Sequence, residues 1–267
     1  MLVFYFLFFL LGLAVGSFLN VVISRLKTRE SILKIRSHCP FCQKKLNWYE
    51  LIPILSFVIQ RGKCRKCGKR ISWQYPLIEL VTGLAFLLIL NFQFPISNFQ
   101  ILISTCCLLL VSCFLIILFV YDLKHYLVPD KIIYPAIVLT FGFRIWNLFR
   151  ISNFEFRILN QFLNYLIASI IAGGFFLAII LISRGKWMGA GDIKIGILMG
   201  LVLGTEKTLA ALFLAFLVGA FISFVLLILR KKTLKSEIPF APFLTGATFI
   251  TLLWGDILIK WYLDLIK

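Results

Sequence analysis

Acidic residues are scarce in this chain, where Asp and Glu number 11 among 267 residues against 28 Lys and Arg. Charged residues make up only 15% of the sequence, hydrophobic residues make up 61%, and the mean hydropathy is +0.99. This composition excludes an ordinary soluble domain and predicts a polytopic membrane protein. Because a carboxylate at the edge of a membrane is costly, each of the few acids becomes a candidate for function.

Three further features are absent from the sequence, and each absence bears on the class of protein or on its partners. No Lys or Arg precedes the first apolar run and no small-residue cleavage site ends it, which favours a retained membrane span over a secretion signal. The basic residues lie in short loops and form no aromatic-interleaved basic domain, so we expect no nucleic-acid partner. No glycine-rich nucleotide turn is present, and the cofactor-binding residues therefore remain unknown.

Long apolar runs make up most of the sequence. A helix needs about 20 apolar residues to cross the hydrocarbon core. The sequence predicts an all-α polytopic membrane protein of about eight transmembrane helices, with a cytoplasmic zinc-binding loop between the first two. Residues 194–204 are about half the usual length, so this segment is expected to be tilted, re-entrant or buried among its neighbours. The eight runs lie near residues 1–24, 76–91, 100–121, 132–149, 161–183, 194–204, 208–229 and 239–263.

The distribution of basic residues predicts the orientation. Residues 25–70 hold 13 of the 28 Lys and Arg, which places this loop in the cytoplasm and the N-terminus outside. Alternation through eight spans then places 122–131, 184–194 and 230–238 in the cytoplasm, and all three carry Lys or Arg, the last including Lys231, Lys232 and Lys235. The C-terminus falls outside, and Arg150 and Arg157 are the main exceptions to the pattern.

Two acids end up on the same side in this topology. Asp122 closes the third apolar run, and two further spans separate it from the loop that carries Asp192. Two crossings return the chain to the same face, so we expect both acids at the cytoplasmic boundary of the membrane. Two neighbouring carboxylates do not ionise together easily, so one pKa rises and the pair can share a proton for acid–base chemistry.

The residues around Asp192 support a site there. Asp192 ends the tetrapeptide Gly189, Ala190, Gly191, Asp192 and precedes an apolar helix, where an Asp can also serve simply as a helix cap. Gly189 and Gly191 argue for more than a cap, because they remove side-chain bulk and let another segment approach the acid closely. Asp130, directly after Pro129, is expected to cap the fourth span.

Four cysteines in the large loop have the spacing of a metal site. Cys39 and Cys42 form one C-x2-C pair, and Cys64 and Cys67 form a second. This spacing predicts a four-thiolate zinc site of structural type, because four thiolates leave no open position for a substrate. Disulfides are the alternative, but the loop is assigned to a reducing compartment.

Three further features of this part of the chain have more than one possible role. Residues 43–63 between the cysteine pairs are too apolar for a solvated linker and are expected to pack on the helices or dip into the membrane interface. Glu79 lies just inside the second span, where an acid can reach the interface, pair with a loop cation or belong to a site. His38 and His125 are expected to be surface or loop histidines.

Several stretches together resemble a known family, the type IV prepilin peptidases, which are GxGD-type intramembrane aspartic proteases. Neither departure from the family pattern, Lys27 for a proline and Ala241 for a glycine, involves the acids, although Ala241 could restrict a close backbone contact. Besides Asp122, the tetracysteine loop and GAGDIK ending at Lys194, the matching stretches are GSFLNVVISRL at 16–26, IPILS at 52–56, RGKC at 61–64, YPLIEL at 75–80 and IPFAPFL at 238–244.

The resemblance implies a function and a place in the cell. The expected enzyme cleaves prepilins or pseudopilins after a glycine that ends a basic leader, with Asp122 and Asp192 as catalytic residues and Gly189, Gly191 and Lys194 in the active-site loop. It also implies N-methylation of the new N-terminus with S-adenosylmethionine, and a location in the bacterial cytoplasmic (inner) membrane. We expect residues 1–24 to be the first helix, 25–75 the zinc loop and 76–267 the peptidase core.

Two other classes of protein remain as alternatives. A proton-coupled transporter could use paired acids as a proton relay, but it would place them near the bilayer midplane and show an internal repeat, and neither is visible. A non-enzymatic assembly scaffold could use the zinc loop for docking, but it leaves the two acids unexplained. The sequence does not identify the particular pilin, distinguish pili from secretion, or give the oligomeric state.

Overall fold

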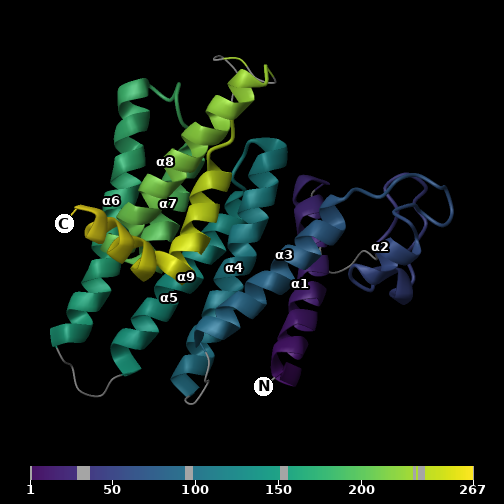
Figure 1. Cartoon of the computed structure of the whole chain (residues 1–267), viewed down its shortest axis with the longest axis horizontal. Coiled ribbons are helices and arrows are strands. Elements are labelled where there is room, and N and C mark those ends of the chain that lie inside the picture. Colours follow the sequence, from purple (N-terminus) through teal and green to yellow (C-terminus); the bar gives the residue numbers. More distant parts are fainter. Residues whose placement is uncertain are drawn as a thin grey trace. The chain divides into compact units, whose positions relative to one another are not determined.

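The computed structural model describes residues 2–28, 37–93, 99–150, 156–230, 233 and 238–266. Lys231, Lys232 and Lys235, which the predicted charge pattern includes, lie outside the described residues. All eight predicted apolar runs form helices (Figure 1). The elements are α1 (Leu2–Thr28), the 3-10 helix η1 (Trp48–Leu51), α2 (Leu55–Ile59), α3 (Gln74–Gln93), α4 (Phe99–His125), α5 (Asp130–Arg150), α6 (Phe156–Ser183), α7 (Ala190–Leu203), α8 (Thr205–Ile228) and α9 (Ala241–Ile266).

Six of these helices are long and apolar enough to cross a membrane, namely α1, α3, α4, α6, α8 and α9. The predicted class, an all-helical polytopic membrane protein, is therefore confirmed for the described part of the chain. The helices α5 and α7 are not among the six, and the count of eight crossings stays a prediction.

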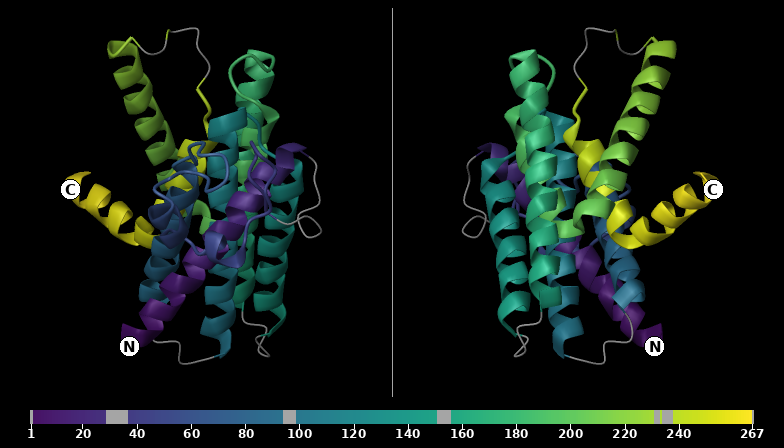
Figure 2. Two further views of the ribbon diagram at one scale, coloured as in Figure 1. Left: turned by 90° about the vertical axis from the view of Figure 1, so that its right-hand side faces the viewer. Right: turned by 90° about the vertical axis from the view of Figure 1, so that its left-hand side faces the viewer.

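The chain forms two compact units, residues 1–117 and 118–267, with the boundary inside α4. In the first unit α1 packs along α3, as Figure 2 shows. Glycines make this approach possible: a Cβ added to Gly12 would lie 2.7 Å from the Cα of Gly83, and one added to Gly16 would lie 2.7 Å from the Cα of Glu79. Small residues four apart are a common means of bringing membrane helices close together.

The second unit is organised around the short helix α7, which contacts α5, α6, α8 and α9. This explains how so short a segment is accommodated, and the expectation that it is buried among its neighbours is confirmed. The contact with α6 again depends on glycines, because a Cβ on Gly196 would lie 2.8 Å from the Phe176 ring and one on Gly200 would lie 2.3 Å from the backbone of Ser169.

A charged side chain holds the C-terminal end of α7. Arg144 of α5 donates from Nε to the carbonyl oxygen of Leu201 at 3.0 Å and from Nη2 to that of Val202 at 2.8 Å, and its guanidinium lies 3.5 Å from the centre of the Tyr165 ring. A cation at this end satisfies free carbonyl groups and complements the helix dipole. Arg144 therefore helps to fix the helix whose opposite end carries Asp192.

Candidate functional site

Each cysteine pair in the first unit is held in a tight turn. In the first turn, the Cys39 N–H donates to the Lys44 carbonyl at 3.0 Å and the Gln43 N–H donates to the Cys39 carbonyl at 2.9 Å. The backbone of Gln43 has a φ of +57°, which is unfavourable for a residue with a side chain. These bonds point the two thiols of the turn toward the same space.

The second turn repeats the first. The Cys64 N–H donates to the Lys69 carbonyl at 2.9 Å and the Gly68 N–H donates to the Cys64 carbonyl at 2.9 Å. Here the positive φ of +67° falls on a glycine, which adopts it without steric cost. The two turns are therefore alike in backbone and differ in the residue that carries the strained angle.

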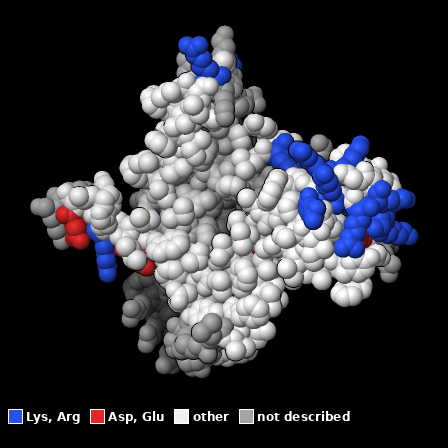
Figure 3. Space-filling model, turned by 45° about the vertical axis from the view of Figure 1, so that its right-hand side comes forward, with Lys and Arg blue, Asp and Glu red and all other residues white. Residues whose placement is uncertain are grey.

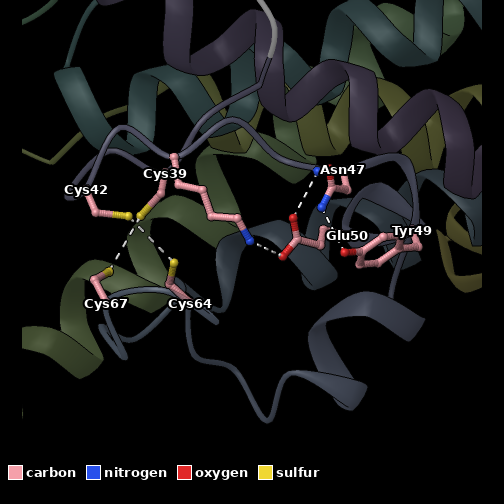
Figure 4. Close-up of polar contacts among 8 residues, drawn as sticks. Cys39, Cys42, Asn47, Tyr49, Glu50, Cys64 and Cys67 are labelled. Atoms are coloured by element: carbon pink, nitrogen blue, oxygen red, sulfur yellow. Dashed lines mark hydrogen bonds and ion pairs between the residues drawn. The ribbon is translucent and has the colours of Figure 1, made fainter.

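The four thiols meet at one point. All four sulfur atoms lie within 4.8 Å of one another, with Cys39 and Cys67 at 3.9 Å and Cys42 and Cys64 at 4.0 Å (Figure 4). Tetrahedral zinc–sulfur bonds of about 2.3 Å would hold the sulfurs about 3.8 Å apart. The described loop can thus hold a metal ion, as the spacing predicts.

The thiols of the second turn differ in acidity. Backbone N–H groups of Cys67 and Lys66 lower the pKa of Cys64 to about 6, and a thiolate there is therefore stable near neutral pH. Although the Lys69 backbone favours the Cys67 thiolate, burial and the neighbouring sulfurs raise the pKa of Cys67 to about 11. A bound cation would remove this conflict, because it stabilises all four thiolates together.

A buried acid ties the first turn to η1. Glu50 accepts a hydrogen bond from the Asn47 N–H at 2.9 Å, as Figure 4 shows, and a second from the Lys44 ammonium at 2.9 Å. The Asn47 backbone and the Lys44 charge hold the pKa of Glu50 below its usual range. Since Lys44 also accepts the Cys39 N–H, one residue links the metal turn to η1.

Glu79 connects the same loop to α3. Its carboxylate, buried in the first unit, accepts hydrogen bonds from the Ile54 N–H at 2.8 Å and from Ser17. Ile54 has a φ of +59°, which is rare for a β-branched residue and shows that its surroundings impose the conformation. The contact gives Glu79 a role the sequence reading did not anticipate, which is to bind the backbone of the loop.

The two predicted acids lie in the second unit and are both buried, with exposed fractions of 5% for Asp122 and 8% for Asp192. Asp122, near the end of α4, accepts a hydrogen bond from the backbone N–H of Ala241, the first residue of α9. Asp192, in the first turn of α7, accepts one from the backbone N–H of Gly189. Each carboxylate is thus directed by a helix N-terminus, where anions are favoured.

Asp122 and Asp192 also act on each other. Asp192 lies outside the six spans, and burial, together with the negative charge of Asp122, raises its pKa to about 7. The structure therefore brings together the two acids that counting of helices placed on one side. One of them can carry a proton at neutral pH while the other stays ionised.

Gly191 allows this arrangement. A Cβ added to Gly191 would lie 2.6 Å from Cγ2 and 2.8 Å from Cβ of Val128, which belongs to the loop after Asp122. The expected close approach of another segment is therefore present at Gly191. At Gly189, in contrast, an added Cβ meets nothing within 4 Å and φ is −89°, so its backbone N–H rather than its missing side chain serves the site.

Lys194 does not pair with either buried acid in the described contacts. Its ammonium forms an ion pair with Asp130 and lies 4.9 Å from the centre of the Tyr134 ring, which ties α7 to the start of α5. Asp130, predicted as a cap, is the first residue of α5 and uses its carboxylate for this ion pair. His125 ends α4 and packs edge to face against Tyr121, with the ring centres 4.6 Å apart.

Sequence reasoning missed four contributors to these sites. Val128 lies in the stretch after Asp122 that contributes to the family resemblance, but its contact with Gly191 was not predicted, and nothing around Arg144 indicates a role. The prediction that the departure at Ala241 does not involve the acids is wrong, because Ala241 is buried and its backbone N–H donates to Asp122. The strained Ile54 carries no mark in the sequence beyond its place in the IPILS stretch.

These features define a class: an all-helical membrane protein with a tetracysteine metal loop and a buried pair of aspartates at the ends of its helices. Residues 10–93 match the family model of the bacterial peptidase A24 N-terminal domain, and residues 108–224 match that of the type IV leader peptidase family. The first match lies within the first unit and most of the second lies within the second unit.

Full-length relatives agree with the family models. The prepilin leader peptidase/N-methyltransferase of Bacillus subtilis is 33% identical over 257 residues, which cover 96% of this chain and 97% of the relative. Those of Aeromonas hydrophila and Pseudomonas aeruginosa are 32% and 30% identical, over 96% of this chain and 93% and 92% of theirs. A comparison with solved structures gave no significant match. The chain belongs to the type IV leader peptidase family and is a multi-pass protein of the bacterial inner membrane.

Proposed function

We propose that this chain is an aspartic endopeptidase that removes the basic leader from type IV prepilins or pseudopilins and N-methylates the new N-terminus. The observation that carries the peptidase assignment is the buried pair Asp122 and Asp192. Family membership supports both activities, because the full-length relatives are named for both. We assign residues 1–24 to the first transmembrane segment, 25–75 to the metal loop and 76–267 to the peptidase core, although α1 itself continues to Thr28.

The two acids divide the chemistry between them. The ionised carboxylate draws a proton from the attacking water, whose oxygen bonds to the scissile carbonyl carbon, while the protonated carboxylate donates to the carbonyl oxygen. As the C–N bond breaks, the first carboxylic acid gives its proton to the amine nitrogen and the second carboxylate takes one back from a hydroxyl of the intermediate, so the pair ends as it began and no cofactor is consumed. The pKa of Asp192, raised to about 7, supports a proton shared by the pair at neutral pH.

The substrate reaches the acids from the cytoplasmic side. Both acids lie at helix ends, and the two long helices between them, α5 and α6, return the chain to the same end. Lys and Arg in the adjoining loops support a cytoplasmic position, with both termini outside. A prepilin whose apolar helix lies in the bilayer would then present its leader at this face.

The metal loop holds a structural zinc ion in this proposal. The separations of the four sulfurs fit tetrahedral zinc, and all four ligand positions are filled by thiolates. S-adenosylmethionine supplies the methyl group for the second activity. We assign no residues to its binding. The predicted active-site loop is the start of α7, with Gly189 as the residue before the helix and Gly191 and Lys194 in its first two turns, and we keep these residues as the surroundings of Asp192.

Co-expression with a prepilin tests the peptidase assignment. Asp122→Asn and Asp192→Asn should each abolish loss of the leader, because either change leaves the pair without its shared proton chemistry. The matched control is Asp256→Asn, which removes an acid of the second unit that is exposed and ion-paired with Lys207. If Asp122→Asn or Asp192→Asn removed the leader at the wild-type rate, this pair of acids would not be the catalytic site.

A further inference from the structure

The metal loop presents a row of exposed apolar side chains. In α2 these are Leu55, Val58 and Ile59, with exposed fractions of 58%, 64% and 68%. Their spacing of three and four residues places them on one face of the helix. Trp73, which directly precedes α3, is 76% exposed. Such a face in water would be costly, because apolar surface of this extent favours burial.

Two contacts fix α2 at the start of the membrane span α3. At its N-terminal end, the Ile54 N–H donates to Glu79, and in its middle Phe57 packs at a tilt against Trp73, with the ring centres 5.0 Å apart. Glu79 lies five residues after Gln74, the first residue of α3, or about 7.5 Å along the helix axis. The short helix is therefore held beside the first two turns of a span, at the depth where the hydrocarbon begins.

The charges of the loop fit the headgroup layer above that depth. Residues 37–73 contain eight Lys and Arg and a single acid, Glu50, which is buried and paired with Lys44. Figure 3 shows the Lys and Arg side chains gathered over the metal loop. The apolar row and the cations together match a segment that lies in the interface of an anionic bilayer, with tryptophan at the boundary.

We propose that α2 and Trp73 form a membrane-docking surface that lies at the boundary between the headgroups and the acyl chains of an anionic bilayer. Glu79 sets the depth of this surface by holding Ile54, and the metal-bound turns present the loop cations to the headgroups. The docking surface goes beyond the proposed enzymatic function and does not depend on it. It would keep the loop at a fixed height above the membrane.

Tryptophan depth quenching tests this proposal in the full chain. Variants that keep Trp73 alone, or carry Ile59→Trp or Lys45→Trp as their sole tryptophan, are placed in nanodiscs with anionic phosphatidylglycerol brominated high on the acyl chain. We expect lipid quenching at Trp73 and Ile59→Trp to be several-fold stronger than at Lys45→Trp, which instead responds to aqueous acrylamide. The full metal content of each variant confirms that the loop is folded.

The other outcomes overturn the proposal. Quenching of Ile59→Trp by acrylamide alone would place α2 in water. Protection from both quenchers would show that protein covers it, either a second copy or a bound substrate. Added to the Ile59→Trp variant, Glu79→Ala should weaken lipid quenching, whereas Glu79→Gln, which keeps an acceptor for Ile54, should retain it. Equal quenching in the two would contradict the role of Glu79.

Discussion

The metal loop and the aspartate site are built in opposite ways. The loop places its ligands through hydrogen bonds between residues close in sequence, such as Cys39 with Lys44, and its surface is exposed and basic. The aspartate site joins distant segments: Asp122 receives the N–H of Ala241, and Gly191 packs against Val128. A local motif can thus complete itself with a metal ion, whereas the acids depend on the packing of whole helices.

Loss of one metal ligand should affect only the loop. In Cys64→Ser the metal content is expected to fall from a full equivalent to near zero, because three thiolates hold zinc far less tightly than four. Elemental analysis of the purified protein measures this. Asp192→Asn, the matched change at the other site, should keep its metal, and equal loss of metal in both variants would show that the two sites are not independent.

A substitution at Gly191 can selectively disrupt its close contact with Val128. A Cβ there would overlap Val128, and we expect Gly191→Ala to lower the rate of leader cleavage by roughly 10- to 100-fold, the equivalent of an overpacking cost of about 1–3 kcal/mol. Gly189→Ala is the control, since its Cβ meets nothing within 4 Å. Gly191→Ala combined with Val128→Ala should recover much of the rate. Equal effects of the two single changes would contradict the packing argument.

Burial of Asp192 predicts a dependence of stability on pH. Its pKa is raised from 3.8 to about 7, so its contribution to stability is fully present below about pH 4 and is lost as the pH rises through 7. The Tm of the wild type should therefore fall by a few degrees between about pH 5 and about pH 8. Asp192→Asn removes this titration, and its Tm should vary less over the same range. An identical pH profile would mean that Asp192 is ionised throughout.

The smallest predicted effect is a difference in metal retention between substitutions in the two cysteine turns of the metal loop. Gln43 and Gly68 occupy matching positions with φ of +57° and +67°. Gln43→Gly should relieve strain and strengthen metal retention by about 1 kcal/mol, whereas Gly68→Ala should weaken it by a similar amount. Competition with a chelator measures both. A loss of metal affinity in Gln43→Gly would contradict the equivalence of the turns.

Part of each site could be predicted from the sequence. The C-x2-C spacing is itself the geometry of a metal turn, so Cys39, Cys42, Cys64 and Cys67 were predicted together. The two acids were paired by parity, because two intervening helices return the chain to the same end. Neither argument needs a knowledge of how the helices pack.

The remaining features arise from packing between distant segments. The approach of Val128 to Gly191 and the bond from Ala241 to Asp122 appear only when α5, α7 and α9 are in place. Arg144 likewise satisfies carbonyl groups that belong to α7. The sequence shows that α7 contains glycines, but it does not show which helix packs against them. Sequence therefore identifies the reacting groups more readily than the contacts that position them.

The most direct measurement is the N-terminal mass spectrum of a prepilin co-expressed with the wild type, Asp122→Asn or Asp192→Asn. We expect a pilin without its leader and carrying one methyl group for the wild type, and an intact precursor for both variants. A spectrum in which either variant still yields the mature pilin would contradict the assignment of Asp122 and Asp192 as the catalytic pair.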